Sequence, residues 1–356
     1  MLWSGSIGGI QRQVAALVRA AAAHGSLRHE ALFLDGRGTV AEELEAEGLA
    51  LRLYYRRRSY VPFHVSLIRA LQTRSPAIVH VHSPLPVKTV LLAMTARRDA
   101  GWIYTQRSPG ALDRTRKARI FYSFLGARFD RFIATTSVMA ACVSAHGVEP
   151  ESIVVIPNAR TLPIRPEAAT STPRLIGTVA RLSRQKRIDI FLDVVAELHC
   201  RGIDCSALVV GDGPLRGELV RYRDRLGLER VVRFVGEQED VASWLDRFGL
   251  LFITSSSEPF GNVAVEGMAR RVPVVAMPSR GGLVEIVSGG GLLLEDRDVG
   301  RAADALETLL HDHDARNALQ QRADKALPAY DPASIVAKLE RLYAEVVPEL
   351  SSRIQG

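Results

Sequence analysis

The sequence has few cysteines and no apolar run long enough to cross a membrane. Its three cysteines, Cys142, Cys200 and Cys205, have no paired spacing, which argues against a disulfide framework or a structural zinc site and favours a reducing compartment. The most apolar early run, Val14 to Ala23, is short and interrupted by Arg19. It therefore predicts a core helix, and neither a membrane span nor a signal peptide. We expect a cytoplasmic protein.

Several catalytic signatures are also missing. The chain has no GxxxxGKS/T phosphate loop and no GxSxG nucleophile elbow. Asp296-Arg-Asp298 is interpreted as the loop that begins a helix, and His311-Asp-His-Asp314 as a solvated surface segment, so no metal site is predicted. No cofactor or metal is expected.

Positive charge is concentrated in the first part of the chain. Residues 1–160 contain 21 Lys and Arg against 11 Asp and Glu, within a whole-chain formal charge of +7. The clusters include Arg56-Arg57-Arg58, Arg97-Arg98 and Arg114 to Arg119. Each could be an ordinary solvated surface. The asymmetry instead indicates an anionic partner, such as a phosphate-bearing acceptor or the inner face of an anionic membrane, at which the protein would be peripheral. Nucleic acid is not expected, because no recognised binding module accompanies the charge.

The length of 356 residues predicts two domains. In both halves short apolar strands alternate with helical stretches, which predicts an α/β fold with mainly parallel sheets covered on both faces. The strands expected in the first half are 30–34, 77–82, 101–105, 131–135 and 152–157, and those in the second half are 175–179, 207–210, 231–234, 250–254 and 273–276. The polar, proline-bearing segment 163–173 is the predicted linker between a domain at 1–162 and another at 174–330. Apolar residues at helical spacing in 333–347 predict a long amphipathic helix within a terminal segment, 331–356.

The segment from Ser255 to Glu266 carries the strongest functional signal. Glu258 follows a buried strand, and Glu266 lies about one turn into the next helix. Between them the amides of Gly261, Asn262 and Val263 can face an anion, because the first donors of a helix have no partner within it. The layout fits a sugar-nucleotide, with carboxylates for hydroxyls and the helix end for the diphosphate. The alternative is that both acids only favour the start of the helix electrostatically.

A basic loop follows another strand of the second half. Arg181 and Lys186 lie at the carboxyl end of 175–179, where open α/β sheets bind ligands, and two cations there can neutralise a diphosphate. Gly211 and Gly213 in the turn after 207–210, and Gly281 and Gly282 after 273–276, allow a backbone to approach a ligand closely. Each glycine turn could equally be a plain loop.

The first half offers weaker signals. Gly8 and Gly9 precede the first helix and could line a cleft. His80 and His82 end a strand, so His82 could reach an interdomain cleft, although a lone histidine is more often structural.

The order of these motifs resembles the retaining glycosyltransferases of the family 4, or group 1, type, which have the two-domain GT-B fold. The likeness spans nearly the whole chain: Gly8-Gly9, the His80-Val-His82 strand end, Asn158 before the linker, Arg181 and Lys186, the Gly211 turn, Glu258 to Glu266, and the late Gly-Gly followed by Glu285. The glutamate segment is highly specific, and the glycine turns are supportive.

The resemblance implies two Rossmann-like domains facing a cleft, with a C-terminal helix that crosses back to the first domain. It implies transfer of a sugar, with retention and without a metal, from a nucleotide-sugar to a lipid-linked or cell-envelope saccharide. The implied catalytic residues are Glu258, Lys186, Arg181 and His82. The implied donor-binding residues are Gly9, Arg181, Lys186, Gly211, Gly213, Glu258, Phe260, Gly261, Asn262, Val263 and Glu266.

Two departures from the family pattern stand out. Only Met1 to Ile7 precede the Gly-Gly pair, so the first strand is expected to be truncated or missing. Where relatives carry a Thr-x-His pattern, this chain has Thr105-Gln-Arg107, and an arginine cannot act as a base at ordinary pH. Two alternatives therefore stay open: a nucleotide-sugar isomerase of the 2-epimerase type, and an inactive paralogue that serves as a binding subunit.

Overall fold

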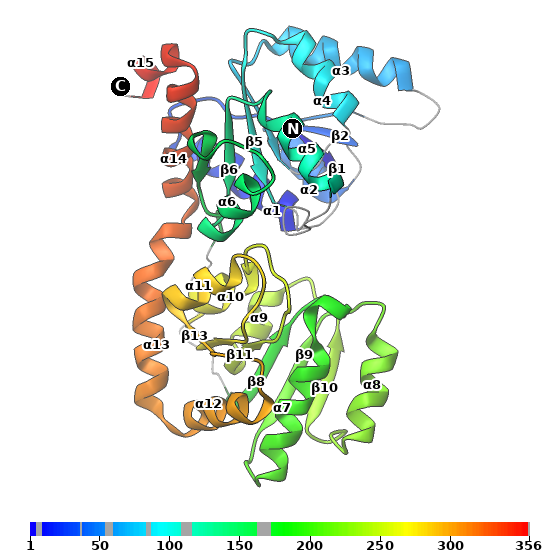
Figure 1. The fold of residues 1–356 in the computed structure, drawn as a ribbon, viewed down its shortest axis with the longest axis vertical. Helices are drawn as coiled ribbons and strands as arrows, with labels where there is room; N and C mark the ends of the chain where they lie inside the picture. Colours follow the sequence, from blue (N-terminus) through cyan, green and yellow to red (C-terminus); the bar gives the residue numbers. More distant parts are fainter. Residues whose placement is uncertain are drawn as a thin grey trace. The chain divides into compact units, whose positions relative to one another are not determined.

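The computed structural model describes residues 1–4, 9–35, 38–53, 60–82, 87–107, 116–161 and 172–354. The chain forms two compact units, one of Met1–Thr161 with Ala329–Gly356 and the other of Leu162–Pro328 (Figure 1). Most of the predicted linker lies outside the described residues. Its last two residues do not belong to a linker, because Thr172 already pairs with Phe248 in a sheet.

Unit 1 (Met1–Thr161 with Ala329–Gly356) contains parallel strands in two adjoining sheets. One has the order β1-β2-β3 and the other β4-β5-β6-β7. The strands are β1 (Leu2–Ser4), β2 (Ala31–Asp35), β3 (Ala50–Arg52), β4 (Ile78–His82), β5 (Gly101–Gln106), β6 (Arg131–Ala134) and β7 (Ile153–Val155). Every residue of β5 is buried, as expected for a strand covered on both faces.

A strand does precede the first helix, so the expectation that it is missing is wrong. Residues Leu2–Ser4 form β1, in which Leu2 pairs with Phe33 and Ser4 with Asp35 of β2. Met1 joins the two sheets, because its amino group donates to the carbonyl of His80 (2.5 Å) and its own carbonyl accepts from the amide of His82 (3.0 Å). The chain therefore adds strands outward from β1 to β3 and then returns to the other side of β1 with β4, so the strand order reverses there.

The helices of unit 1 include one from the end of the chain. They are α1 (Gly9–His24), α2 (Thr39–Ala46), α3 (Tyr60–Arg74), α4 (Val87–Ala96), α5 (Arg116–Gly126), α6 (Ser137–Ser144), α14 (Pro332–Val346) and α15 (Ser351–Ile354), with 3-10 turns η2 (Pro150–Ser152) and η5 (Pro348–Leu350). Helix α14 packs against α1, and its apolar face shares a core with Leu17, Ile103 and Ile156. The predicted terminal helix is thus part of unit 1.

Unit 2 (Leu162–Pro328) contains one parallel sheet of order β10-β9-β8-β11-β12-β13. The strands are β8 (Thr172–Val179), β9 (Ser206–Val210), β10 (Val232–Gly236), β11 (Phe248–Ile253), β12 (Val274–Ala276) and β13 (Leu292–Leu293). The chain builds outward from β8 to β10 and then returns to place β11 on the other side of β8. This reversal is a topological switch point, where the loops at the carboxyl ends of the two central strands diverge and leave room for a ligand.

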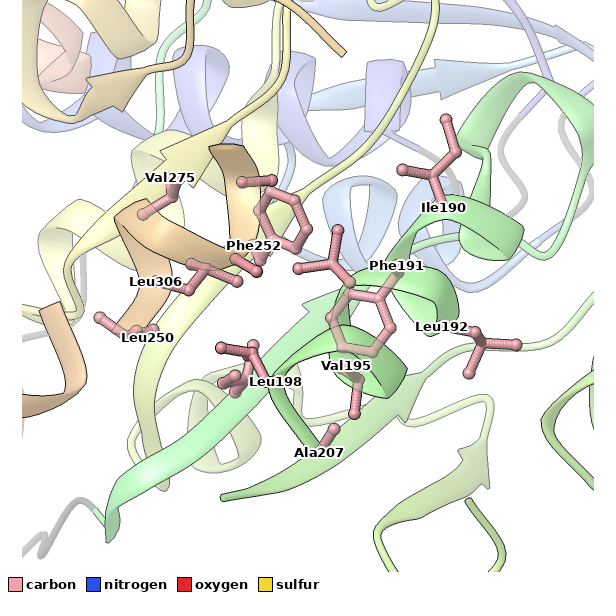
Figure 2. Close-up of a cluster of buried hydrophobic side chains, with 14 of the residues drawn as sticks. Ile190, Phe191, Leu192, Val195, Leu198, Ala207, Leu250, Phe252, Val275 and Leu306 are labelled. Atoms are coloured by element: carbon pink, nitrogen blue, oxygen red, sulfur yellow. The ribbon is translucent and has the colours of Figure 1, made fainter. Parts of the chain in front are cut away.

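The helices of unit 2 are α7 (Ile188–Cys200), α8 (Arg216–Arg225), α9 (Val241–Leu245), α10 (Asn262–Ala269), α11 (Leu283–Gly290), α12 (Val299–His311) and α13 (His313–Ala326), with 3-10 turns η3 (Arg184–Lys186) and η4 (Leu327–Tyr330), the latter at the unit boundary. Figure 2 shows part of the core, in which α7 and α12 cover one face of the sheet. Phe191 and Phe252 are fully buried there with ring centroids 6.1 Å apart. The core holds β8 and β11 rigidly beneath their loops.

All ten strands predicted from the sequence are present, with ends that differ by at most three residues. None of the helices in the described part of the chain is both long and apolar enough to span a bilayer.

Candidate functional site

The switch point of unit 2 brings together a lysine and a glutamate from distant segments. Lys186 ends η3 after β8, and Glu258 follows β11. The ammonium of Lys186 donates to Oε2 of Glu258, and each side chain is 19% exposed. The pair is therefore held in place but remains accessible to a ligand.

Hydrogen bonds fasten the two loops to each other. The carbonyl of Gln185 accepts from the amide (2.8 Å) and hydroxyl (3.1 Å) of Ser256, while its side-chain amide donates to the carbonyl of Ser257 (2.6 Å). The hydroxyl of Thr254 donates to the carbonyl of Lys186 (3.0 Å). These bonds set the separation of Lys186 and Glu258 before any ligand arrives, which lowers the cost of ordering the site.

Helix α10 begins beside this pair. Gly261 is its N-cap with φ 103°, a conformation that favours glycine, and a Cβ there would lie 2.6 Å from Cδ1 of Leu283. Asn262, Val263 and Glu266 are partly exposed along the first turns, whereas Phe260 is buried at 3% exposure. The start of α10, Glu258 and Glu266 thus lie at one edge of the sheet, as the sequence predicts. Phe260 packs in the interior.

The glycine turn after β12 holds the Glu258 segment. The amide of Glu258 donates to the carbonyl of Arg280 (2.8 Å), and the amide of Arg280 donates to the carbonyl of Ser256 (3.0 Å). Gly281 has φ 107°, and a side chain there would overlap the carbonyl of Glu258. Glu285, in the first turn of α11, is exposed.

Gly211 and Gly213 approach protein backbone. A Cβ at Gly211 would overlap the carbonyl of Ala180, and one at Gly213 would lie 2.5 Å from the carbonyl of Leu182. Both glycines therefore let the turn after β9 pack on the loop that carries Arg181. The side chain of Arg181 is exposed and makes no hydrogen bond with the described residues, so it is not part of the Lys186–Glu258 contact.

Sequence reasoning missed Arg297 as a site residue. Its guanidinium donates to the carbonyls of Thr254 (2.5 Å), Pro278 (2.7 Å) and Ser255 (3.3 Å), which lie after β11 and β12. The neighbouring Asp298 caps α12 by accepting from the amide of Arg301 (2.8 Å), so the predicted helix start is confirmed. An arginine between two aspartates next to a helix start gives no signal that it reaches back to other loops.

In unit 1, a second group of polar residues lies at the carboxyl ends of β4, β5 and β7. His82 is 7% exposed and its ring lies 3.9 Å, centroid to centroid, from that of His80. The guanidinium of Arg107 donates from Nε to Nδ1 of His82 (3.3 Å) and from Nη1 to the side-chain oxygens of Gln13 (2.6 Å) and Asn158. Gly9 begins α1, and Gly8 lies outside the described residues.

The protonation of His82 follows from these contacts. Burial lowers the pKa of His82 well below its usual value, and the nearby His80 and Arg107 lower it further. The ring is therefore neutral, and because Nδ1 accepts from Arg107, the proton resides on Nε2. In this arrangement Nε2 is a hydrogen-bond donor and cannot accept a proton as a base.

One arginine of the basic clusters is buried. Arg97 is 7% exposed and donates to Asp99 (2.9 and 2.6 Å) and to Ser75 (2.5 Å). It therefore stabilises the turn before β5. Arg56, Arg57, Arg58 and Arg114 lie outside the described residues, and Arg98, Arg116 and Arg119 are exposed.

Comparisons with known proteins agree with this architecture. The glycosyl transferases group 1 model matches residues 162–326, and the glycosyltransferase family 4 model matches residues 7–162. The crystal structure of Anabaena Alr3699/HepE in complex with UDP and glucose superposes with a TM-score of 0.79 at 20% identity, covering 96% of this chain and 98% of that one.

Curated relatives are similar over shorter stretches. The D-inositol 3-phosphate glycosyltransferase of Corynebacterium jeikeium is 34% identical over 49% of this chain and 44% of its own length. The lipopolysaccharide core biosynthesis mannosyltransferase LpsB of Rhizobium meliloti is 27% identical over 75% of this chain and 71% of its own. The chain spans about half the length of the first curated relatives it matches.

Two α/β units with parallel sheets, and a polar site at the switch point of the second, define a GT-B protein. The chain belongs to the group 1 glycosyltransferases of the family 4 type.

Proposed function

We propose that this protein transfers a sugar from a nucleotide-sugar donor to a saccharide acceptor with retention of the anomeric configuration. The observation that carries the proposal is the Lys186–Glu258 pair beside the start of α10. A diphosphate needs cations and amide donors, and a sugar needs hydrogen-bond acceptors for its hydroxyls. The loops after β8 and β11 present both at one edge of the sheet.

In the proposed complex, Lys186 turns from Glu258 to the diphosphate and the first amides of α10 face the same phosphates. Glu258 then accepts from sugar hydroxyls and Glu266 from the ribose. The bond between the anomeric carbon and the diphosphate oxygen breaks with its electron pair on that oxygen, and the positive charge of Lys186 stabilises it. The acceptor oxygen forms the new bond to the anomeric carbon on the same face and passes its proton to the departing diphosphate oxygen.

Arg181 would add a second cation to the diphosphate once a donor is bound. Its exposed side chain is unconstrained by the described residues, so it can reorient without breaking a protein contact. The glycines at 211 and 213 support this loop through backbone packing, and we propose no direct contact between them and the donor. His82 would act as a hydrogen-bond donor through Nε2.

The names of relatives support a saccharide or other polyol acceptor of the cell envelope or of small-molecule metabolism. One relative is named for inositol 3-phosphate and another for the lipopolysaccharide core. A neighbouring structure contains UDP and glucose. Within this proposal the acceptor is a lipid-linked or cell-envelope saccharide, and the reaction needs no metal.

Donor binding is the first test. A thermal-shift panel of UDP-, GDP-, ADP- and dTDP-sugars should identify a ligand that raises the melting temperature, because a ligand of the native state stabilises it. Lys186→Ala and Glu258→Ala should each remove the shift. Arg184→Ala is the matched control, because Arg184 is an exposed cation of the same 3-10 turn. A folded wild-type protein that binds none of these donors contradicts the proposal.

Turnover separates the proposed transferase from its alternatives. Transfer to a saccharide, with the anomeric configuration of the product determined by NMR coupling constants, should show retention. An epimerised donor formed without acceptor would instead support an isomerase. Tight donor binding without turnover across a broad acceptor panel would support an inactive binding subunit.

A further inference from the structure

The carboxyl edge of the unit 1 sheet contains an arginine whose described partners are all neutral. Arg107 follows β5, and its hydrogen bonds go to the ring of His82 and the side-chain oxygens of Gln13 and Asn158. These three partners are 7%, 2% and 4% exposed. They form a polar floor built from β4, α1 and the segment after β7.

The charge of this arginine is not balanced by a carboxylate among the described residues. No ion pair joins Arg107 to a described acid, and the charged side chain that lowers its pKa, after burial, is a second cation, Arg160. Burial lowers the pKa of Arg107 to about 10, so the guanidinium is still positive at neutral pH. Cations in protein interiors are normally paired, because removing a charge from water is costly.

One amino group of the guanidinium makes no hydrogen bond with the described residues. The side chain is partly exposed, and no described residue accepts a hydrogen bond from Nη2. The floor holds Nε and Nη1, so the direction of the Nη2 edge is fixed. A planar guanidinium with a fixed edge is the group that proteins favour for binding carboxylates and phosphates.

We propose that Arg107 binds an oxyanion, a phosphate or a carboxylate, carried by the acceptor. The site lies at the carboxyl ends of β4, β5 and β7 and next to the switch point between β1 and β4, where open α/β sheets bind ligands. The excess of positive charge in the first 160 residues also favours an anionic ligand, because it attracts such a substrate over longer distances. This inference rests on the proposed function in assigning the ligand to the acceptor.

A binding experiment tests the site without requiring turnover. The full chain carrying Lys186→Ala, which weakens phosphate binding in unit 2, is melted in sodium phosphate, sodium malonate and sodium chloride at matched ionic strength. Phosphate or malonate should raise the melting temperature relative to chloride. Adding Arg107→Gln should weaken the apparent affinity at least tenfold, and Arg107→Lys should keep part of it. Arg98→Gln, at an exposed arginine of the same unit, should change nothing.

A transfer experiment identifies the source of the oxyanion. With the donor found in the panel above, neutral sugars are compared with their phosphates and with uronic acids. The wild type should prefer one charged class, and Arg107→Gln should lower kcat/KM for that class tenfold to a hundredfold. The slow hydrolysis of donor should stay unchanged, because the donor binds in unit 2. The rate with neutral sugars should fall less than the rate with the charged class, because neutral sugars make no ionic contact with the guanidinium.

Specific results would overturn the inference. Equal anion-dependent shifts with and without Arg107→Gln, or no shift in either protein, would show that Arg107 has a structural role only. A variant that loses both stability and all activity would indicate the same, because the hydrogen bonds of Arg107 to its three buried partners would then be its main contribution. Failure of the proposed function is distinct, since absent donor binding leaves the anion-binding result intact.

Discussion

Glu340 of α14 is expected to hold this helix against the segment that follows α1 in unit 1. Its carboxylate is 3% exposed and accepts from the amides of Ser26 and Leu27 (both 3.0 Å) and contacts Nε2 of His29 (3.1 Å). Glu340→Ala leaves both amides without this acceptor. A hydrogen bond to a charged group is worth about 1.5–3 kcal/mol. Water can reach Ser26, which is exposed, so the lower value applies and the expected loss is about 3 kcal/mol for the two bonds.

The assay is urea unfolding followed by circular dichroism, together with hydrogen exchange of the segment that follows α1. Glu340→Ala should lower the free energy of unfolding by about 3 kcal/mol and speed the exchange of the Ser26 and Leu27 amides. Glu340→Gln, which keeps one acceptor oxygen, should lose about half as much. Glu345→Ala, at an exposed glutamate of the same helix, should stay within about 0.5 kcal/mol of the wild type.

The reasoning is refuted if Glu340→Ala and Glu345→Ala differ by less than about 1 kcal/mol, or if the two amides exchange at wild-type rates in Glu340→Ala. Either result would mean that apolar packing of α14 alone supports this part of unit 1.

Three further predictions concern acid stability, strand packing and donor binding. Burial lowers the pKa of His80 and His82 well below 6.5, so in acid the unfolded chain binds more protons than the folded one. The free energy of unfolding of unit 1 should not depend on these histidines above about pH 7.5, and below about pH 6.5 it should fall by about 1.4 kcal/mol per pH unit for each of them. His82→Gln should reduce this slope in urea titrations. Gly177→Ala should cost about 1–3 kcal/mol, because its Cβ would overlap the ring of Phe248, whereas Gly289→Ala, a helical glycine with open space around it, should be neutral or stabilising; equal unfolding midpoints would contradict this. Arg297→Met should weaken nucleotide-sugar binding about tenfold in calorimetry, because it releases the loops after β11 and β12. Arg301→Met, at an exposed ion pair, should leave the affinity unchanged, and similar affinities for the two variants would rule out a positioning role for Arg297.

The sequence by itself determined the local structure of this protein. Apolar runs of strand length, separated by amphipathic helices and glycine turns, placed every predicted strand within a few residues. Glu258, the start of α10 and Glu266 could be positioned relative to one another because they are neighbours along the chain. These features depend on side-chain periodicity and turn chemistry, which act over a few residues. A three-residue strand such as β1 is too short to show periodicity, and it was missed for that reason.

Tertiary structure alone decided which loops meet. Lys186 and Glu258 are 72 residues apart and touch because β11 returns to the other side of β8. The same topology lets Arg297 bind three carbonyls of other loops, turns Gly211 toward Ala180, and surrounds Arg107 with neutral partners. Strand order depends on how whole sheets bury their faces, and no single segment encodes that choice. The sequence therefore predicts which functional side chains lie at each strand end, but the fold decides which other residues they contact.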